Sequence, residues 1–449
     1  MNTDIFKFEH YNFNPKTNVA SFNYCINRQQ PGKNKHKTIK FTETLQFPKT
    51  KQKINKYRLN ALDKALFNLF LIAGITYYKT YCPKKIELKS HKLSLKQAKF
   101  WNKLYTKGLG EFFYQNKINP KELIKFPHQK NYHPKNIKLN LNKILVPLGG
   151  GKDSVLTCEI LKQNKFDFDL ISLRKFNTTS KVAKTIDKKL FIINRKIDPK
   201  FFKINRKKNV YSGHIPFSAY TSFTALVFAI LHGYKFIIYS NERSSNYGNT
   251  KYFGQQINHQ YAKSFEFEQD ITQYINTFIT PNINYFSLLR PWYEIKITQK
   301  FSQYEKYFPQ FSSCNLANFK FSGQQKNRWC CQCPKCVFVW TMLSAFLPLK
   351  QLIKIFKCNL YQNKKLEPIF QELLGQKKTK PFECVGTPEE MQLALYLASK
   401  KSDYQHNFII KQFTKQLLPK IKNIKYLQKK LFKTYNQHNL PKKFQQIIK

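Results

Sequence analysis

From Lys143 onward, short apolar runs alternate with longer helical patterns. The runs "KILVPL", "FDLISL", "KLFIIN", "KFIIYS" and "INYFSLL" have the length and β-branched content of buried strands. Helices are predicted between them over residues 153–163, 217–233 and 260–278. This alternation predicts an α/β fold with a parallel, doubly wound sheet. Such sheets bind ligands outside the carboxyl ends of their strands.

The two flanking parts of the chain have other patterns. Residues 1–140 combine alternating segments such as "NVASFNYCI" with an apolar helix candidate, "LDKALFNLFLIAGITYYKTY", and end in a polar, proline-bearing linker over 127–142. Residues 346–449 predict helices with lysine-rich faces, one of them opened by Thr387 with Glu390 completing a capping box. We therefore expect an N-terminal α+β domain (1–140), a core (141–345) and a C-terminal helical region (346–449).

Composition favours a folded cytoplasmic protein. Hydrophobic residues make up 42% of the 449 residues and aromatic residues 16%, enough for a packed interior. The most apolar candidate for a span, Phe223 to Ser240, is broken by His232, Gly233 and Lys235, so no membrane span is expected. The N-terminus has no apolar signal region.

The net charge of +53 comes almost entirely from lysine, with eight arginines in the chain. One interpretation is a biased residue usage, in which lysine fills solvated positions along the whole chain. The other is a surface for a polyanion, or a basic cleft for a phosphorylated small substrate. The even spread of the lysines favours the first, so no nucleic-acid partner is expected.

The stretch "PLGGGKDS" between the first strand and helix of the core predicts a phosphate site. Consecutive glycines allow a tight turn and close backbone approach to an anion, and the following helix directs its first N–H groups there. A side-chain ammonium, a carboxylate able to hold Mg²⁺ and a hydroxyl come next. The candidate residues are Gly149, Gly150, Gly151, Lys152, Asp153 and Ser154.

The spacing of this loop fits neither the Walker pattern nor G-x-G-x-x-G. It resembles the S-G-G-x-D-S loop of the PP-loop ATP pyrophosphatases, with Gly149 where that family has its first serine. The resemblance implies that the loop holds the pyrophosphate of ATP while the α-phosphorus is attacked. The departure removes one hydroxyl and leaves the backbone donors.

Further motifs occur in a fixed order along the chain. They are "AGITYYK", "YTKGLGEFFYQN", "SGHIPFS", "SNERSSN", "INHQYAKSFEFE", "RWCCQCPKC" and "PFECVGTPEE". Together with the loop, over residues 60 to 400, this set is similar to the UDP-N-acetylmuramoyl-L-alanyl-L-glutamate epimerases, the MurL family. The resemblance implies an ATP- and Mg²⁺-dependent isomerase of peptidoglycan precursor synthesis. It would convert the terminal L-Glu of UDP-MurNAc-L-Ala-L-Glu to D-Glu, releasing AMP and pyrophosphate.

A phosphate loop has a chemical purpose in such an epimerase. The α-proton of a glutamate is poorly acidic beside an ionised carboxylate, because its loss places a second negative charge next to the first. An acyl adenylate removes that charge, and a side-chain base can then take the proton. Hydrolysis restores the acid.

Candidates for the remaining roles follow from position. Asn241, Glu242, Arg243 and Ser244 directly follow a predicted strand, where Arg243 suits a carboxylate or phosphate and Glu242 suits Mg²⁺ or a base. A solvated loop ion pair is the alternative. For proton transfer the candidates are His214, His259, Lys263 and Cys384, with Glu266 predicted near His259 on the same helix face. Structural histidines, a surface ion pair and a buried core thiol are the plainer alternatives.

Cys314, Cys330, Cys333 and Cys336 have the spacing C-x15-C-x2-C-x2-C, with Cys331 left over. Four thiolates suit a tetrahedral, closed and therefore structural Zn²⁺ site, and cyanodeazaguanine synthases among the PP-loop enzymes carry a similar one. An iron–sulfur cluster or reduced thiols in a substrate loop are alternatives.

Two other functions fit part of the sequence. A PP-loop enzyme that modifies tRNA or nucleotides would use the charge and the thiols. A zinc-stabilised nucleic-acid-binding protein would keep the loop as a vestige. Both would bind RNA with a steep salt dependence.

Overall fold

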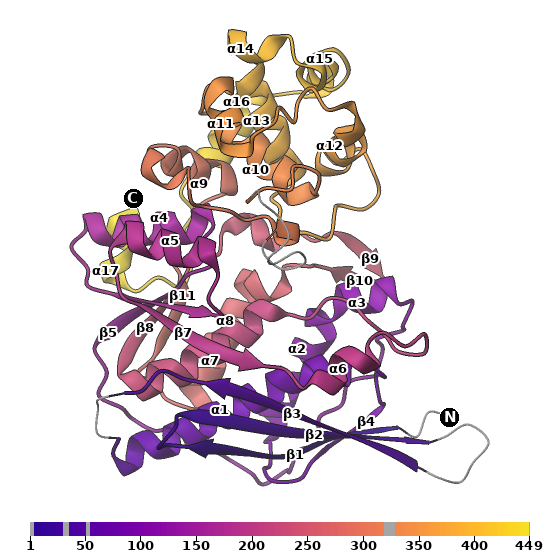
Figure 1. Cartoon of the computed structure of the whole chain (residues 1–449), viewed down its shortest axis with the longest axis vertical. Coiled ribbons are helices and arrows are strands. Elements are labelled where there is room, and N and C mark those ends of the chain that lie inside the picture. The colour runs from indigo at the N-terminus through magenta and orange to yellow at the C-terminus, as the bar shows by residue number, and fades with distance from the viewer. Residues whose placement is uncertain (1–3, 30–35, 51–53, 318–327, 449) are drawn as a thin grey trace.

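The computed structural model describes residues 4–29, 36–50, 54–317 and 328–448 (Figure 1). Its main feature is a nine-stranded sheet in the order β11-β8-β5-β6-β7-β3-β2-β1-β4. A separate two-stranded hairpin lies apart from it. The sheet contains β1 (Ile5–Asn14), β2 (Val19–Gln29), β3 (His36–Gln46), β4 (Lys85–Leu88), β5 (Lys143–Pro147), β6 (Asp169–Leu173), β7 (Leu190–Lys196), β8 (Tyr234–Tyr239) and β11 (Asn284–Ser287), and the hairpin contains β9 (Thr250–Tyr252) and β10 (Gln255–Ile257).

Strands β11, β8, β5, β6 and β7 pair in parallel, which confirms the predicted parallel sheet. Each of them corresponds to one of the five apolar runs found in the sequence. Along the sheet, the chain order reverses between β5 and β8. Loops that leave these two strands diverge there and leave room for a ligand at the carboxyl edge.

The N-terminal strands extend this same sheet. β1, β2 and β3 form an antiparallel meander, and residues Thr44–Gln46 of β3 pair with Asn194–Lys196 of β7. The sheet is therefore mixed, and the N-terminal α+β segment is built on the core sheet.

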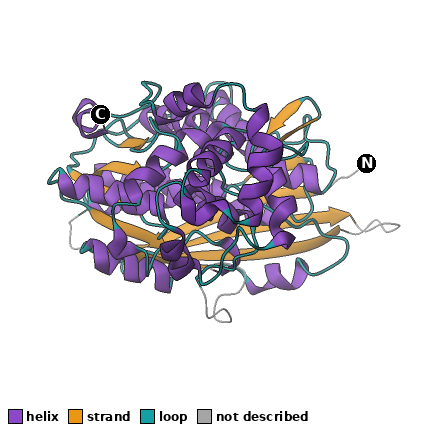
Figure 2. Ribbon diagram, turned by 90° about the horizontal axis from the view of Figure 1, so that it is seen from above, coloured by secondary structure: helices purple, strands orange, loops and turns teal. Residues whose placement is uncertain are grey.

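Alternate strand residues point to two different hydrophobic cores, because successive side chains leave opposite faces of a strand. Leu145 and Ile237 belong to the core with α1 and α7, whereas Val146 and Ile238 belong to the core with α4 and α10. Figure 2 shows helices on both sides of the sheet. The helices of the first core are α1 (Lys56–Tyr78), α2 (Leu95–Gly108), α3 (Gly110–Gln115), α6 (Pro199–Ile204), α7 (Phe217–His232) and α8 (Phe265–Phe278).

The second core contains the remaining helices and joins the C-terminal region to the sheet. Most of these C-terminal helices gather at one end of the molecule (Figure 1). The last helix returns, and Phe444 packs on Phe166, Phe236 and Phe286. The helices are α4 (Lys152–Gln163), α5 (Asn177–Ile186), α9 (Glu294–Phe301), α10 (Pro334–Ser344), α11 (Leu349–Phe356), α12 (Glu367–Leu373), α13 (Pro388–Ser399), α14 (Ser402–Gln405), α15 (Phe408–Gln412), α16 (Ile424–Phe432) and α17 (Lys442–Gln445).

Helix α1 is the described helix that is long and apolar enough to cross a membrane by length and composition, a feature missed in the sequence. In the fold, 78% of its most apolar stretch is buried. Its buried Asn68 accepts a hydrogen bond from Tyr274 Oη on α8. α1 therefore has the environment of a core helix.

Of two helix starts predicted from the sequence, one is confirmed and one is wrong. The start of α13 is confirmed, because Thr387 accepts from Glu390 N and the Glu390 carboxylate accepts from Thr387 N at 2.7 Å. The helix predicted from residue 260 was placed too early. The helix begins at Phe265, with Ser264 as its N-cap, and Tyr261–Lys263 form a separate 3₁₀ turn.

Candidate active site

The glycine loop joins the end of β5 to the start of α4 as expected. Gly150 has φ +81°, a left-handed backbone conformation that favours glycine. A Cβ atom on Gly151 would lie 2.6 Å from Ser313 Oγ, so a side chain there would have to displace the Ser313 hydroxyl. Gly149 has no atom within 4 Å of such a position and is exposed. The loop thus presents open backbone at the first helical turn.

A cavity of about 640 Å³ opens at this loop, beyond the carboxyl ends of β5 and β8. Its wall brings together candidates that lie far apart in the sequence. From the glycine loop it includes the first and third glycines and the two polar residues after Lys152. From the later motifs it includes one asparagine, one glutamate, both histidines, the lysine and the thiol. These residues are Gly149, Gly151, Asp153, Ser154, Asn241, Glu242, His214, His259, Lys263 and Cys384.

Three acidic side chains converge at the base of the loop. Asp153, Glu242 and Glu294 each place a carboxylate oxygen within 4.8 Å of the other two. The buried Lys152 ammonium donates to Asp153 and Glu294. An all-oxygen set of this kind has the donor chemistry that Mg²⁺ requires, and the lysine meets part of its negative charge.

These carboxyl groups differ in their affinity for a proton. Burial and the Asp153 charge raise the pKa of Glu294 to about 7 and also raise the pKa of Glu242. Burial opposes ionisation of Asp153 as well, but the charges of Lys152, Lys335 and Lys263 together outweigh burial and lower the pKa of Asp153. Glu294 was missed in the sequence, although it follows the strand run "INYFSLL" at the same edge.

A second cluster surrounds the Cys384 thiol. Lys263 Nζ donates to Cys384 Sγ at 3.2 Å, and His259 makes a side-chain hydrogen bond to the same sulfur. The His259 Nδ1 atom is hydrogen-bonded to Glu111 Oε2. Glu111 was not among the candidates, because it lies in the motif "YTKGLGEFFYQN" far from the loops that it meets here.

The contacts within this cluster shift the pKa values of Cys384 and His259 in opposite directions. Burial opposes the thiolate, but the Lys263 charge and the His259 hydrogen bond bring the pKa of Cys384 well below its usual value. Burial also disfavours the His259 imidazolium, yet Cys384 and Glu111 raise the pKa of His259 to about 9. These groups therefore form a thiolate paired with an ammonium and an imidazolium.

The His214 ring lies against His259, with 4.4 Å between the ring centroids. Burial and the His259 charge lower the pKa of His214 well below its usual value. At neutral pH the cavity therefore contains one neutral imidazole, able to accept a proton, beside one imidazolium.

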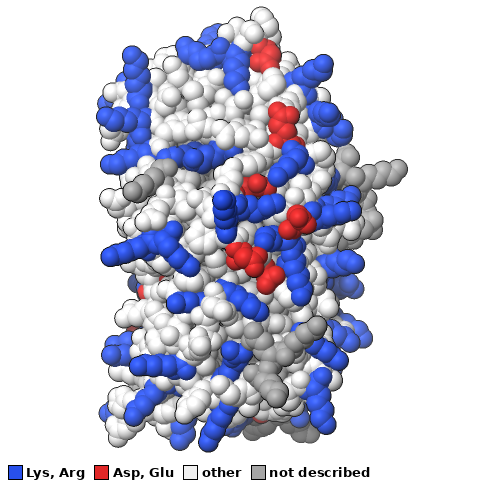
Figure 3. All heavy atoms as spheres, turned by 90° about the vertical axis from the view of Figure 1, so that its left-hand side faces the viewer, with Lys and Arg blue, Asp and Glu red and all other residues white. Residues whose placement is uncertain are grey.

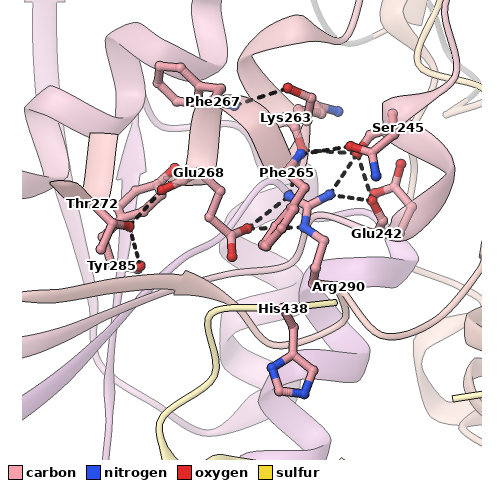
Figure 4. Close-up of polar contacts among 12 residues, drawn as sticks. Glu242, Ser245, Lys263, Phe265, Phe267, Glu268, Thr272, Tyr285, Arg290 and His438 are labelled. Carbon is pink, nitrogen blue, oxygen red and sulfur yellow. Dashed lines mark hydrogen bonds and ion pairs between the residues drawn. The ribbon is translucent and has the colours of Figure 1, made fainter. Parts of the chain in front are cut away.

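The buried Arg290 guanidinium holds the backbone of two of these residues. It donates to the Glu242 carbonyl oxygen at 2.6 Å and to the Lys263 carbonyl oxygen at 2.7 Å, and it is paired with Glu268 Oε2 (Figure 4). It also donates to Ser245 Oγ at 3.0 Å. Arg290 thus fixes the loops after β8 and β10 relative to each other.

Several candidates lie outside the cavity wall formed by the described residues. The Arg243 guanidinium lies 3.9 Å from the ring centroid of Tyr435, and Ser244 Oγ donates to Glu390 Oε1 at 2.9 Å. Gly150 and Lys152 are buried and do not line the cavity. Glu266 was expected beside His259, but it pairs with Lys103 and Lys107, because α8 starts after residue 264.

The four cysteines of the predicted metal site lie together, with all sulfurs within 4.8 Å of one another. Cys314 Sγ is 4.0 Å from Cys333 Sγ, and Cys330 Sγ is 3.7 Å from Cys336 Sγ. Sulfurs at ~2.3 Å around a tetrahedral Zn²⁺ lie about 3.8 Å apart, so the donor set fits that ion. Cys331 points elsewhere and donates to the Phe356 carbonyl oxygen.

The thiol site adjoins the glycine loop. Ser312 N donates to the Gly150 carbonyl oxygen at 3.1 Å, two residues before Cys314. Asn315 donates to Glu383, the neighbour of Cys384. The cysteine cluster therefore holds a segment that contacts both the glycine loop and the neighbour of Cys384.

The surface is rich in lysine. Figure 3 shows Lys and Arg side chains spread from one end of the displayed face to the other, with few acidic groups between them. This distribution resembles general solvation by lysine more than a single basic stripe.

Comparison with known proteins assigns both halves of the chain. Residues 1–288 match the MurL N-terminal domain and residues 310–427 match the MurL C-terminal domain. A UDP-N-acetyl-alpha-D-muramoyl-L-alanyl-L-glutamate epimerase of Xanthomonas oryzae pv. oryzae is 30% identical over 438 residues, which cover 97% of this chain and 95% of that protein. One of Salinispora tropica is 32% identical over 415 residues, 90% of this chain and 86% of that protein. No solved structure matches.

Proposed function

The chain belongs to the MurL family, and on that premise we propose that it is an isomerase that converts the terminal L-Glu of UDP-MurNAc-L-Ala-L-Glu to D-Glu. In this proposal ATP activates the glutamate carboxylate, and AMP and pyrophosphate are released. The observation that carries it is the joint presence of a phosphate-type loop and an acid–base cluster on the wall of one cavity.

The first step is formation of an acyl adenylate. A carboxylate oxygen of the substrate attacks the α-phosphorus of ATP, and pyrophosphate leaves toward the backbone N–H groups at Gly149 to Gly151. Support comes from the open backbone at Gly149 and from the position of the loop between β5 and α4, where the strand order of the sheet reverses beside β5.

Asp153, Glu242 and Glu294 would hold Mg²⁺ through carboxylate oxygens. Bound there, the ion would neutralise phosphate charge. Lys152 would hold the Asp153 and Glu294 carboxylates together. Cys314, Cys330, Cys333 and Cys336 would hold a structural Zn²⁺ that fixes the segment next to the glycine loop.

The second step is proton exchange at the glutamate Cα. Inversion needs a proton acceptor on one face and a donor on the other. His214 is neutral and serves as the acceptor, while Lys263 and His259 carry protons in the same cavity. Hydrolysis of the activated acyl group then restores the carboxylate.

The test is an assay in D₂O with ATP, Mg²⁺ and UDP-MurNAc-L-Ala-L-Glu. We expect deuterium at the glutamate Cα, D-Glu after acid hydrolysis, and one pyrophosphate per ATP consumed. UDP-MurNAc-L-Ala, which lacks the reacting residue, is the matched control and should release no pyrophosphate. ATP consumption without deuterium entry would refute the proposed epimerase.

A further inference from the structure

The cavity contains an activated thiol whose surroundings are those of a nucleophile. Glu111 orients His259, His259 is hydrogen-bonded to Cys384, and Lys263 Nζ lies 3.2 Å from Cys384 Sγ. A carboxylate, an imidazole and a thiol in series form the arrangement that activates cysteine for attack on acyl groups. Of the described residues that line the cavity, Cys384 is the one cysteine.

Two thiols buried in the hydrophobic cores are held differently. Cys158 is fully buried in the second core, where burial raises the pKa of the thiol. Cys82 is also buried, and burial raises its pKa to about 12. Cys384 is partly exposed on the cavity wall, and its pKa is shifted in the opposite direction. Such a contrast separates a reactive thiol from structural ones.

We infer that Cys384 takes the glutamyl group from the adenylate, so that proton exchange occurs on a thioester covalently bound to the enzyme. This inference rests on the proposed function. The Cys384 sulfur attacks the acyl carbon, a C–S bond forms, and the C–O bond to AMP breaks with its electron pair leaving on AMP. Nothing is oxidised or reduced, and water later cleaves the C–S bond to give a carboxylate and the free thiol.

The thioester explains two features of the site. Its carbonyl stabilises the α-carbanion, which a carboxylate does not, so the activation by ATP is kept after AMP has left. The covalent bond also holds the glutamyl group beside His214 and Lys263 during proton exchange. The two positive groups around the sulfur stabilise it as a leaving group when water attacks.

The decisive experiment is intact-protein mass spectrometry after rapid acid quench of the full chain with ATP, Mg²⁺ and UDP-MurNAc-L-Ala-L-Glu. We expect an adduct of the substrate mass minus water, on the peptide that contains Cys384 and released by hydroxylamine. Cys384→Ser should accumulate the more slowly hydrolysed oxygen ester. Cys25→Ser is the control, because Cys25 lies on β2 and donates to Asn27 Oδ1 at 3.1 Å, a bond that serine can keep.

Cys384→Ala separates the possible outcomes. We expect it to keep substrate-dependent exchange of labelled pyrophosphate into ATP and to lose AMP release by about a thousandfold. Exchange without an adduct at any quench time in the unmodified enzyme would overturn the thioester and leave the epimerase standing. If Cys384→Ala still releases AMP but no longer incorporates deuterium, Cys384 acts as a base, and the thioester is overturned. Absence of pyrophosphate exchange in the unmodified enzyme would refute the proposed function itself.

Discussion

Glu111 on α3 and Cys384 before α13 are both hydrogen-bonded to the imidazole of His259. The carboxylate and the thiol belong to the N- and C-terminal parts of the chain, and they meet at the cavity wall. Their joint negative charge keeps His259 protonated.

Replacing Glu111 by Gln should shift the pH dependence of epimerisation. Burial lowers the pKa of His259, but Cys384 and Glu111 raise it to about 9, so activity should fall as pH rises through that value and the imidazolium is lost. Without the Glu111 charge, this fall should move to lower pH by about one to two units. The measurement is kcat/KM against pH.

Glu266→Gln is the control for Glu111→Gln. It removes a carboxylate that pairs with Lys103 and Lys107 at the surface, so the pH profile should not move. Equal profiles for all three proteins would exclude Glu111 as the positioning residue of His259.

Asp153→Asn should reduce ATP turnover by about a thousandfold or more, because it removes one of three converging carboxylates. The melting temperature should change little. Asp167→Asn removes an exposed carboxylate paired with Lys188 and should keep full turnover. Pyrophosphate release as a function of Mg²⁺ concentration measures the effect, and an unchanged Mg²⁺ dependence in Asp153→Asn would exclude the metal role.

Two glycines of the loop should respond in opposite ways to serine. Gly149→Ser places its Cβ in open space and restores the hydroxyl of the PP-loop pattern, so activity should stay within a few-fold of the unmodified enzyme. Gly151→Ser brings Cβ to 2.6 Å from Ser313 Oγ and should raise the KM for ATP and lower stability. Steady-state kinetics and thermal unfolding of the pair measure this; equal behaviour would contradict the loop geometry.

Cys333→Ser should lower the zinc content below one ion per chain and weaken ATP binding, because the thiol cluster holds the segment that donates to Gly150. Cys331→Ser should keep the zinc, since its sulfur bonds a backbone carbonyl outside the cluster. Elemental analysis by mass spectrometry measures the metal. A chain purified with intact fold and no metal would refute the zinc site.

Arg290→Met should destabilise the fold by about 3–5 kcal/mol, because Glu268 then keeps a buried charge without its partner. Urea unfolding measures the loss. Adding Glu268→Gln should recover part of the lost stability. If the double variant is no more stable than Arg290→Met, the ion pair contributes little.

The sequence predicted what depends on local pattern. The parallel strands, the glycine loop and the Thr387 cap follow from short-range periodicity and turn chemistry, and the structure has them within a few residues. Cys384 and His259 were named as candidates from motifs, but their contact depends on how distant loops meet. Local pattern carries no signal for that distance.

Arg243 and Arg290 also show that local sequence pattern does not predict tertiary contacts. Arg243 was named because it follows a strand, yet its side chain lies on Tyr435. Arg290 organises the site from within, and its signal was a charged residue inside the apolar run "NYFSLLRPWY". Glu111 and Glu294 likewise acquire their roles through tertiary contacts.

The pairing of β3 with β7 has a consequence for how the protein can be divided. β3 pairs with Asn194–Lys196 at the end of β7, and without β3 the N–H and C=O groups of these residues would lose their partner strand and form an open edge. A fragment beginning near residue 141 would expose that edge and should self-associate through it. The N-terminal meander therefore covers the end of β7 against such self-association, in addition to supplying Glu111 from the helices that follow it.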